Sequence, residues 1–121
     1  MASIVLVEDT PANLALATKL LTAAGHEVVT ASTGADGIRL VAERSPDLVL
    51  MDLGLPDISG RDVLRVIRTT HPHGLRLRVI AFTAHAMVGD RERALAAGFD
   101  GYLSKPIEFA SFVGSVEALL R

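Results

Sequence analysis

Three short runs of the sequence are apolar without interruption, and they constrain the fold more than any other feature. The runs are residues 4–7, 48–51 and 79–82, and they consist mainly of valine, leucine and isoleucine. A run of this kind predicts a strand that is buried on both faces. Longer stretches with helical spacing of apolar residues separate the runs. This alternation is typical of a parallel sheet covered by helices, that is, of an α/β fold.

Two further segments and five helical stretches complete the predicted fold. Residues 27–31 and 101–104 mix polar with apolar side chains, so we expect these two strands at the edges of the sheet. Helices are predicted at residues 11–24, 34–44, 59–70, 86–97 and 107–120.

Residues at the helix starts support these boundaries. Thr10 is a predicted N-cap, and Pro11 after it suits the first helical position. Ser59 and Asp62 have the spacing of a capping box at the start of the third helix.

Three expectations concern how the helices pack. The fourth helix has few large apolar residues and is expected to dock loosely. Phe109 and Phe112 have helical spacing in the fifth helix and are predicted to belong to the core. Arg61, Arg65 and Arg68 recur at spacings near one turn of the third helix and are predicted to form a solvated face.

Composition narrows the possible functions. The 121 residues fit one domain, residues 1–121, and the last predicted helix leaves no room for an output domain. A net charge of −2 predicts no nucleic acid and no membrane surface as partner. The absence of cysteine excludes disulfides and thiolate metal sites. No signal peptide or membrane-spanning stretch is visible, so we expect a cytoplasmic protein.

Polar residues follow four of the predicted strands. In an open parallel sheet, ligands bind outside the carboxyl ends of the strands. Glu8 and Asp9 follow the first strand, Asp52 the third and Lys105 the fifth, while Thr83 ends the fourth. A lone aspartate or threonine at such a place is usually a turn or cap residue. Their joint occurrence at successive strand ends is what indicates a site.

The charges of this predicted site do not balance. Two unit charges ~4 Å apart repel by ~4 kcal/mol at an effective dielectric constant near 20. Lys105 offers one positive charge against the three carboxylates of Glu8, Asp9 and Asp52. A hard divalent cation would balance the remainder, and oxygen ligands favour Mg²⁺ or Mn²⁺.

The chain resembles a response-regulator receiver domain over essentially its full length. The residues that carry the resemblance are Glu8-Asp9, Met51-Asp52 with Leu55-Pro56-Asp57-Ile58-Ser59-Gly60, Phe82-Thr83-Ala84, and Gly101-Tyr102-Leu103-Ser104-Lys105-Pro106. The acidic pair is Glu-Asp, where Asp-Asp is commoner in the family. The resemblance implies a single flavodoxin-like (βα)5 domain with strand order 2-1-3-4-5 and helices on both faces.

The resemblance also implies a role for each site residue. Asp52 would accept a phosphoryl group from a histidine kinase or a histidine phosphotransfer protein. Mg²⁺, or Mn²⁺ in its place, would be held by Asp9, Asp52 and the backbone carbonyl of Gly54, with Glu8 acting through water. Thr83 and Lys105 would contact the phosphoryl oxygens. Tyr102 would change rotamer on activation, and the Lys105-Pro106 peptide bond would be cis.

The same resemblance implies how a signal leaves the domain. Phosphorylation would change the face formed by the fourth helix, the fifth strand and the fifth helix, which a downstream protein would bind. Such a domain catalyses only its own phosphorylation and dephosphorylation, so it is not an enzyme in the usual sense.

Three other interpretations stay open at this point. An aspartate-nucleophile phosphatase on the same fold usually has a second acid two residues after the nucleophile, where this chain has Gly54. A flavin- or nucleotide-binding module would need a phosphate-binding loop after the first strand, where Glu8 and Asp9 place negative charge. Finally, the chain could be the receiver portion of a hybrid kinase, with unchanged chemistry.

Overall fold

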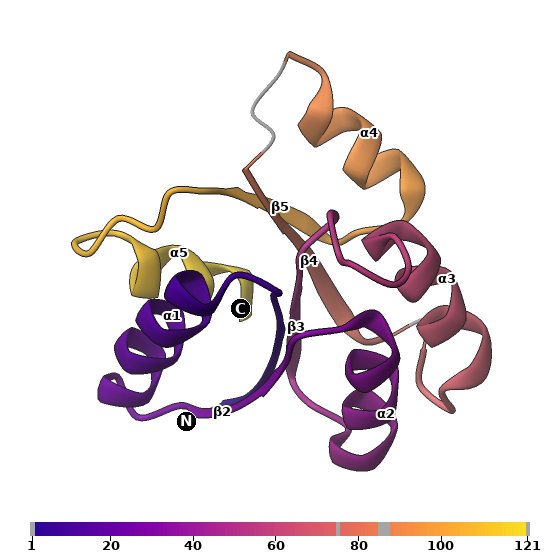
Figure 1. Ribbon diagram of the computed structural model, residues 1–121, viewed down its shortest axis with the longest axis horizontal. Helices are drawn as coiled ribbons and strands as arrows, with labels where there is room; N and C mark the ends of the chain where they lie inside the picture. The colour runs from indigo at the N-terminus through magenta and orange to yellow at the C-terminus, as the bar shows by residue number, and fades with distance from the viewer. Residues whose placement is uncertain (1, 75, 85–87, 121) are drawn as a thin grey trace.

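The strands form one sheet in the predicted order. A computed structural model of the chain describes residues 2–74, 76–84 and 88–120. Within these residues, parallel pairing gives the order β2-β1-β3-β4-β5, with helices on both faces (Figure 1). The predicted doubly wound fold and both edge strands are therefore confirmed. The strands are β1 (Ser3–Val7), β2 (Glu27–Ala31), β3 (Leu48–Met51), β4 (Arg78–Thr83) and β5 (Gly101–Ser104).

Helices alternate with the strands along the chain. Among the described residues, none of them is both long and apolar enough to cross a membrane. The helices are α1 (Pro11–Ala23), α2 (Gly34–Arg44), α3 (Gly60–Thr70), α4 (Asp90–Ala97) and α5 (Phe112–Leu120).

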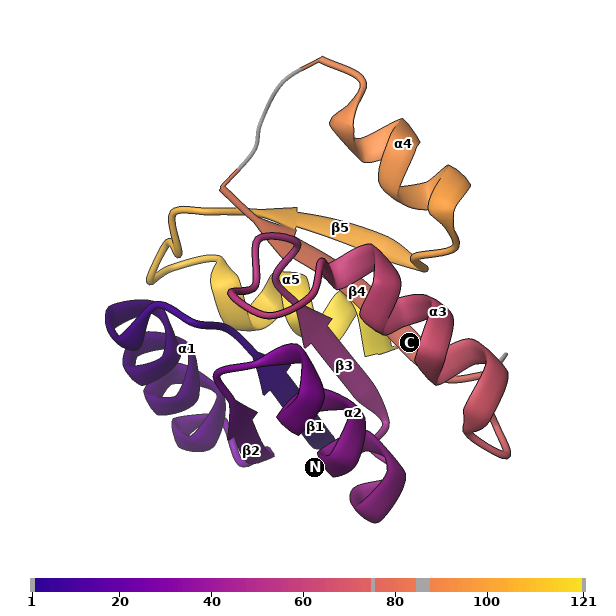
Figure 2. The same cartoon turned by 45° about the vertical axis from the view of Figure 1, so that its right-hand side comes forward.

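Each central strand contributes to two hydrophobic cores, because successive side chains of a strand point to opposite faces. In β1, Ile4 and Leu6 belong to the core beneath α1 and α5. Val5 and Val7 belong to the core on the opposite face, beneath α2 and α3. Figure 2 shows these two helical layers on either side of the sheet.

The last two helices begin later than predicted. The described part of the fourth helix starts at Asp90, and positions 86 and 87 lie outside the described residues. Ala94 is the buried residue of α4, in agreement with loose docking. The fifth helix starts at Phe112, so Phe109 lies on the connecting segment before it and is 69% exposed. The prediction of a core position was right for Phe112 and wrong for Phe109.

Side-chain caps fix the start of two helices. Ser59 Oγ accepts a hydrogen bond from the Asp62 N–H at 3.2 Å, which confirms the predicted cap of α3. Thr33 caps α2 in the same way through the Asp36 N–H, a contact that the sequence did not reveal. Thr10 occupies the N-cap position of α1, but its side chain makes no capping hydrogen bond within the described part of the chain.

Arg68 does not lie on a solvated helix face. Its side chain is 14% exposed. Its guanidinium donates hydrogen bonds to the carbonyl oxygens of Gly74, Leu77 and Gly98, and to Oδ2 of Asp100 at 2.9 Å. The prediction was wrong here because Arg68, in the last turn of α3, faces the segments that enter β4 and β5. It ties the carboxyl end of α3 to the turn after α4.

Candidate functional site

Four strand ends bring the predicted site residues to one edge of the sheet. Parallel neighbours end at the same edge, and backbone hydrogen bonds continue the pairing just beyond the strands. The Asp52 N–H donates to the Val7 carbonyl oxygen at 2.9 Å. The Lys105 N–H donates to the Thr83 carbonyl oxygen, also at 2.9 Å. Asp52 is thereby fixed beside the end of β1, and Lys105 beside the end of β4.

Three carboxylates meet at this edge. Glu8, Asp9 and Asp52 each offer an oxygen, and these oxygens lie within 4.8 Å of one another. Glu8 is completely buried and Asp52 is 6% exposed, whereas Asp9 is exposed. The Thr10 N–H donates a hydrogen bond to Glu8 Oε2 at 3.1 Å. The cluster therefore has one face in the protein and one in solvent.

Lys105 supplies the positive charge inside the cluster. Its Nζ lies 3.3 Å from Asp52 Oδ2 and also forms an ion pair with Glu8. The side chain is 9% exposed, and Nζ lies 5.1 Å from the centre of the Phe82 ring. The ring face attracts a cation, and the apolar ring also limits its hydration. One buried ammonium thus faces two buried carboxylates and a third that is exposed.

Glu8 and Asp52 respond oppositely to this environment. Burial raises the pKa of Glu8 above its usual value, and the neighbouring Asp52 adds to the effect, although Lys105 opposes it. Burial also disfavours the ionised form of Asp52. Hydrogen bonds with Glu8 and from the Gly54 N–H, together with Lys105, outweigh that effect and lower the pKa of Asp52. Asp52 is consequently the member of the pair that ionises more readily.

The donor set suits a hard divalent cation. Glu8 Oε1 is a buried oxygen that accepts no hydrogen bond from any described residue, although the Lys105 ammonium is close to it. The three carboxylates supply oxygen ligands only, as Mg²⁺ prefers. Gly54 is exposed, and its N–H donates to Asp52 Oδ1 at 3.1 Å. An added cation would offset the negative charge that Lys105 leaves uncompensated.

The remaining predicted residues lie around this cluster. Thr83 is 1% exposed at the end of β4. The Lys105–Pro106 peptide bond is cis. Tyr102 is partly buried and packs against the core that contains Ala94 of α4, instead of joining the carboxylates. Burial raises the pKa of Tyr102, and the charge of Asp90 adds to this effect.

Asp57 makes a contact that the sequence did not reveal. Its carboxylate accepts hydrogen bonds from the Gly34 and Ala35 N–H groups at the start of α2. Every non-proline residue has a backbone N–H, so the sequence gives no signal of which ones an aspartate will find. The hydrogen bonds from Gly34 and Ala35 lower the pKa of Asp57.

Comparison with known proteins identifies the family. The sequence profile described as "Response regulator receiver domain" matches residues 4–117. The chain therefore belongs to the response regulator receiver domain family, the receivers of two-component signalling systems. The resemblance predicted from the sequence motifs is confirmed.

Individual relatives agree with this assignment. The chain is 38% identical over 119 residues to the polar-differentiation response regulator DivK of Brucella ovis, and the match covers 98% of this chain and 95% of that protein. It is 40% identical over 121 residues to the transcriptional regulatory protein KdpE of Mycobacterium tuberculosis, of which it covers 52%.

A solved structure supports both the fold and the metal chemistry of the family. The receiver domain of the sensor histidine kinase PA1611 from Pseudomonas aeruginosa PAO1 is 34% identical, with a TM-score of 0.86. The match covers 98% of this chain and 97% of that domain. That crystal structure has a magnesium ion coordinated in its active site cleft.

Proposed function

We propose that this receiver domain accepts a phosphoryl group on the carboxylate of Asp52. The donor is a phosphohistidine of a histidine kinase or of a histidine phosphotransfer protein. The observation that carries the proposal is the convergence of three carboxylate oxygens within 4.8 Å, beside a buried lysine, in a chain of this family. The same chemistry serves a receiver that is a protein by itself and one that is part of a hybrid kinase.

The transfer replaces one bond to phosphorus by another. An oxygen of the ionised Asp52 carboxylate attacks phosphorus, and the P–N bond to the donor imidazole breaks. The bonding electron pair leaves with the imidazole nitrogen. The pKa of Asp52 is lowered from 3.8, so the carboxylate is ionised at neutral pH, as this attack requires. The domain returns to its first state when water attacks phosphorus and inorganic phosphate is released from Asp52. In this proposal the domain catalyses only its own phosphorylation and dephosphorylation.

Neighbouring groups stabilise the charge that is transferred. Asp9, Asp52 and the Gly54 carbonyl are the proposed ligands of Mg²⁺, with Glu8 acting through water and Mn²⁺ able to substitute. When bound, this ion neutralises negative charge on the phosphoryl oxygens. The Lys105 ammonium, 3.3 Å from Asp52 Oδ2, offsets further charge.

The signal is proposed to leave through the face formed by α4, β5 and α5. The Thr83 hydroxyl donates a hydrogen bond to a phosphoryl oxygen and moves inward, which leaves space for Tyr102. A groove of about 290 Å³ lies on this face, and Arg91, Tyr102 and Phe112 are among the residues that line it. A downstream protein binds there. The net charge of −2 argues against direct binding of nucleic acid.

Labelling with a small phosphodonor tests the proposal. Acetyl phosphate with Mg²⁺ should add one phosphate to the wild type, as seen by intact-mass measurement, and none in the presence of chelator. Asp52→Asn should remain unlabelled. Asp36→Asn, which removes an exposed acid of α2, serves as the matched control and should label normally. A comparable mass gain in Asp52→Asn would reject Asp52 as the acceptor.

A further inference from the structure

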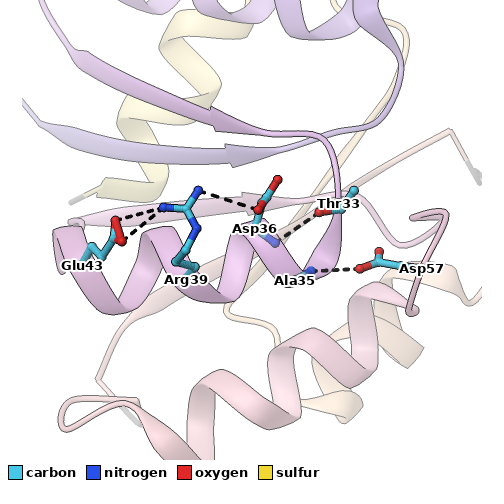
Figure 3. A network of polar contacts seen from close by, with 6 residues as sticks. All are labelled: Thr33, Ala35, Asp36, Arg39, Glu43 and Asp57. Carbon is cyan, nitrogen blue, oxygen red and sulfur yellow. Dashed lines mark hydrogen bonds and ion pairs between the residues drawn. The ribbon is translucent and has the colours of Figure 1, made fainter.

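Asp57 clamps the segment after β3 to the first turn of α2. Its Oδ1 accepts a hydrogen bond from the Gly34 N–H at 2.8 Å, and its Oδ2 accepts one from the Ala35 N–H at 3.0 Å. Figure 3 shows the Asp57 carboxylate at the end of α2, next to the cap made by Thr33. The first N–H groups of a helix have no partner within the helix, and the helix dipole favours a negative charge there. Both oxygens of Asp57 are therefore used to hold α2.

α2 is itself fixed to the strand that leads into the acidic cluster. A Cβ atom at Gly37 would come within 2.8 Å of Val7 Cγ2, so the helix backbone lies close against the end of β1. Leu40 and Val41 of α2 are buried in the core. Val7 is followed directly by Glu8, so α2 packs against the strand that leads into that side of the site.

Apolar contacts also hold the segment between β3 and α3. Leu53, Leu55 and Ile58 pack against the core beneath α2 and α3, and a Cβ atom at Gly34 would come within 2.6 Å of Ile58 Cγ1. The Gly60 N–H donates to the Leu53 carbonyl oxygen at 3.1 Å, which closes the base of the loop. A Cβ built at Gly54 would meet only Asp52 Oδ1 among the described atoms, at 4.0 Å. The side of Gly54 on which a side chain would lie is therefore not packed against the described residues. Asp57, three residues later, adds two hydrogen bonds to α2 beside the apolar contact of Ile58.

We infer that Asp57 is a positioning residue for the metal site. By holding the loop against α2, it keeps the Gly54 carbonyl at a set distance from Asp52, Glu8 and Asp9. This inference rests on the proposed function, in which those groups bind the ion. Asp57 touches neither the ion nor the phosphoryl group, and it acts through the loop.

The inference predicts a change in selectivity between metal ions. Mg²⁺ is small and demands near-ideal octahedral geometry, whereas Ca²⁺ accepts longer and more variable ligand distances. Releasing the loop should therefore weaken Mg²⁺ binding more than Ca²⁺ binding. A general loss of stability would weaken both ions alike, so the ratio of the two affinities separates positioning from a merely structural role.

Binding of Mn²⁺, followed by the electron paramagnetic resonance signal of the free ion, tests the inference without any phosphodonor. Asp57→Ala should weaken Mn²⁺ binding by roughly tenfold, as for other residues that orient metal ligands. Asp57→Asn keeps one acceptor oxygen and should fall between Asp57→Ala and the wild type. Asp36→Ala, in the first turn of the same helix, removes the same charge without a bond to the loop and should bind Mn²⁺ as the wild type does.

Competition of Mg²⁺ and Ca²⁺ against Mn²⁺ then gives the selectivity, which Asp57→Ala should shift severalfold toward Ca²⁺. Equal affinities of Asp57→Ala and the wild type would overturn the inference. So would equal losses in Asp57→Ala and Asp36→Ala, because charge alone would then explain them. Circular dichroism checks that each variant is folded, and Asp57→Asn carries the test if Asp57→Ala is not. Failure of the wild type to bind Mn²⁺ would instead reject the metal site, and with it this inference.

Discussion

The Nζ atom of Lys105 lies 3.3 Å from Oδ2 of Asp52, although 53 positions separate the two residues in the sequence. The contact joins the end of β5 to the end of β3 across the end of β4. The same ammonium pairs with Glu8. Lys105 therefore already neutralises part of the cluster that a divalent ion would bind, and the two cations compete for the same oxygens.

Removing this ammonium should separate phosphorylation from metal binding. Lys105→Ala is expected to slow labelling by acetyl phosphate by about 100-fold, the effect of losing one group that stabilises transferred charge. Its Mg²⁺ affinity should stay the same or rise slightly, because a competing cation is gone. Labelling rates and a Mg²⁺ titration measure the two quantities. Lys19→Ala, an exposed lysine of α1, is the control. A large loss of Mg²⁺ affinity would mean that Lys105 is structural instead.

Glu8 should limit the stability of the metal-free protein. Its pKa is raised above the usual 4.5, so at neutral pH the fold bears a cost for keeping it ionised. Glu8→Gln is expected to increase the free energy of unfolding by on the order of 1 kcal/mol in chelator. The gain should shrink in Mg²⁺, which stabilises the folded wild type. Urea denaturation measures both, with exposed Glu43→Gln as control. A less stable Glu8→Gln protein in chelator would contradict this account.

The clamp made by Asp57 should give a pH dependence of defined sign. Its pKa is lowered from 3.8, so the folded state favours the carboxylate. The stabilisation is present above pH 3.8 and is lost as the pH falls through the lower folded-state pKa. The wild type should therefore be more stable than Asp57→Asn at pH 7, and the two proteins should converge in acid. Denaturation curves at several pH values measure the difference in unfolding free energy between the two proteins. If this difference is unchanged in acid, the Asp57 carboxylate is not its source.

Arg68 and Arg65 offer a matched pair for a stability test. Arg68→Ala would leave the carbonyl oxygens of Gly74, Leu77 and Gly98 without their partner, and is expected to cost about 2 kcal/mol of unfolding free energy. Arg65 is 75% exposed and pairs with Asp62 one turn away, so Arg65→Ala should change stability very little. Similar effects of the two substitutions would show that the buried contacts of Arg68 contribute little.

Amide exchange should reveal the path of the proposed switch. Beryllofluoride with Mg²⁺ mimics the phosphoryl group, and its addition is expected to change exchange most between Ala84 and Leu103. The physical reason is that α4 buries little apolar surface, so a small shift at the end of β4 can move it. Changes confined to α2 would reject this route and leave Tyr102 without a role in signalling.

The sequence predicted the strands, and the edge at which the residues after them emerge, because both depend on local patterns. The apolar runs are uninterrupted, and the residue after a buried parallel strand must emerge at a defined edge of the sheet. Asp52 and Lys105 could therefore be brought together before any contact was known. The convergence of their strand ends also depends on the strand order, which the resemblance to receiver domains implied.

Other features depend on packing that no local pattern encodes. Arg68 continues a helical series of arginines, yet its place at the last turn of α3 turns it toward backbone carbonyls of other segments. Asp57 bonds to N–H groups that lie 22 and 23 positions earlier in the chain. Phe109 has helical spacing, but the helix begins only after it. The outcome depends on backbone hydrogen-bonding groups for Arg68 and Asp57, and on a helix boundary for Phe109. The side chains in the sequence indicate neither of these.

The alternation of side chains in β3 restricts how this sequence can change in length. Leu48 and Leu50 enter one core, Val49 and Met51 enter the other, and Asp52 follows at the edge. A one-residue deletion within β3 would exchange the occupants of the two cores and draw Asp52 into the sheet. Insertions and deletions are therefore tolerable only outside the strands, where they do not shift the alternation of side chains. The connections at the edge of the sheet opposite the acidic cluster meet this condition. A library of such variants should keep folded members there and lose them throughout β3.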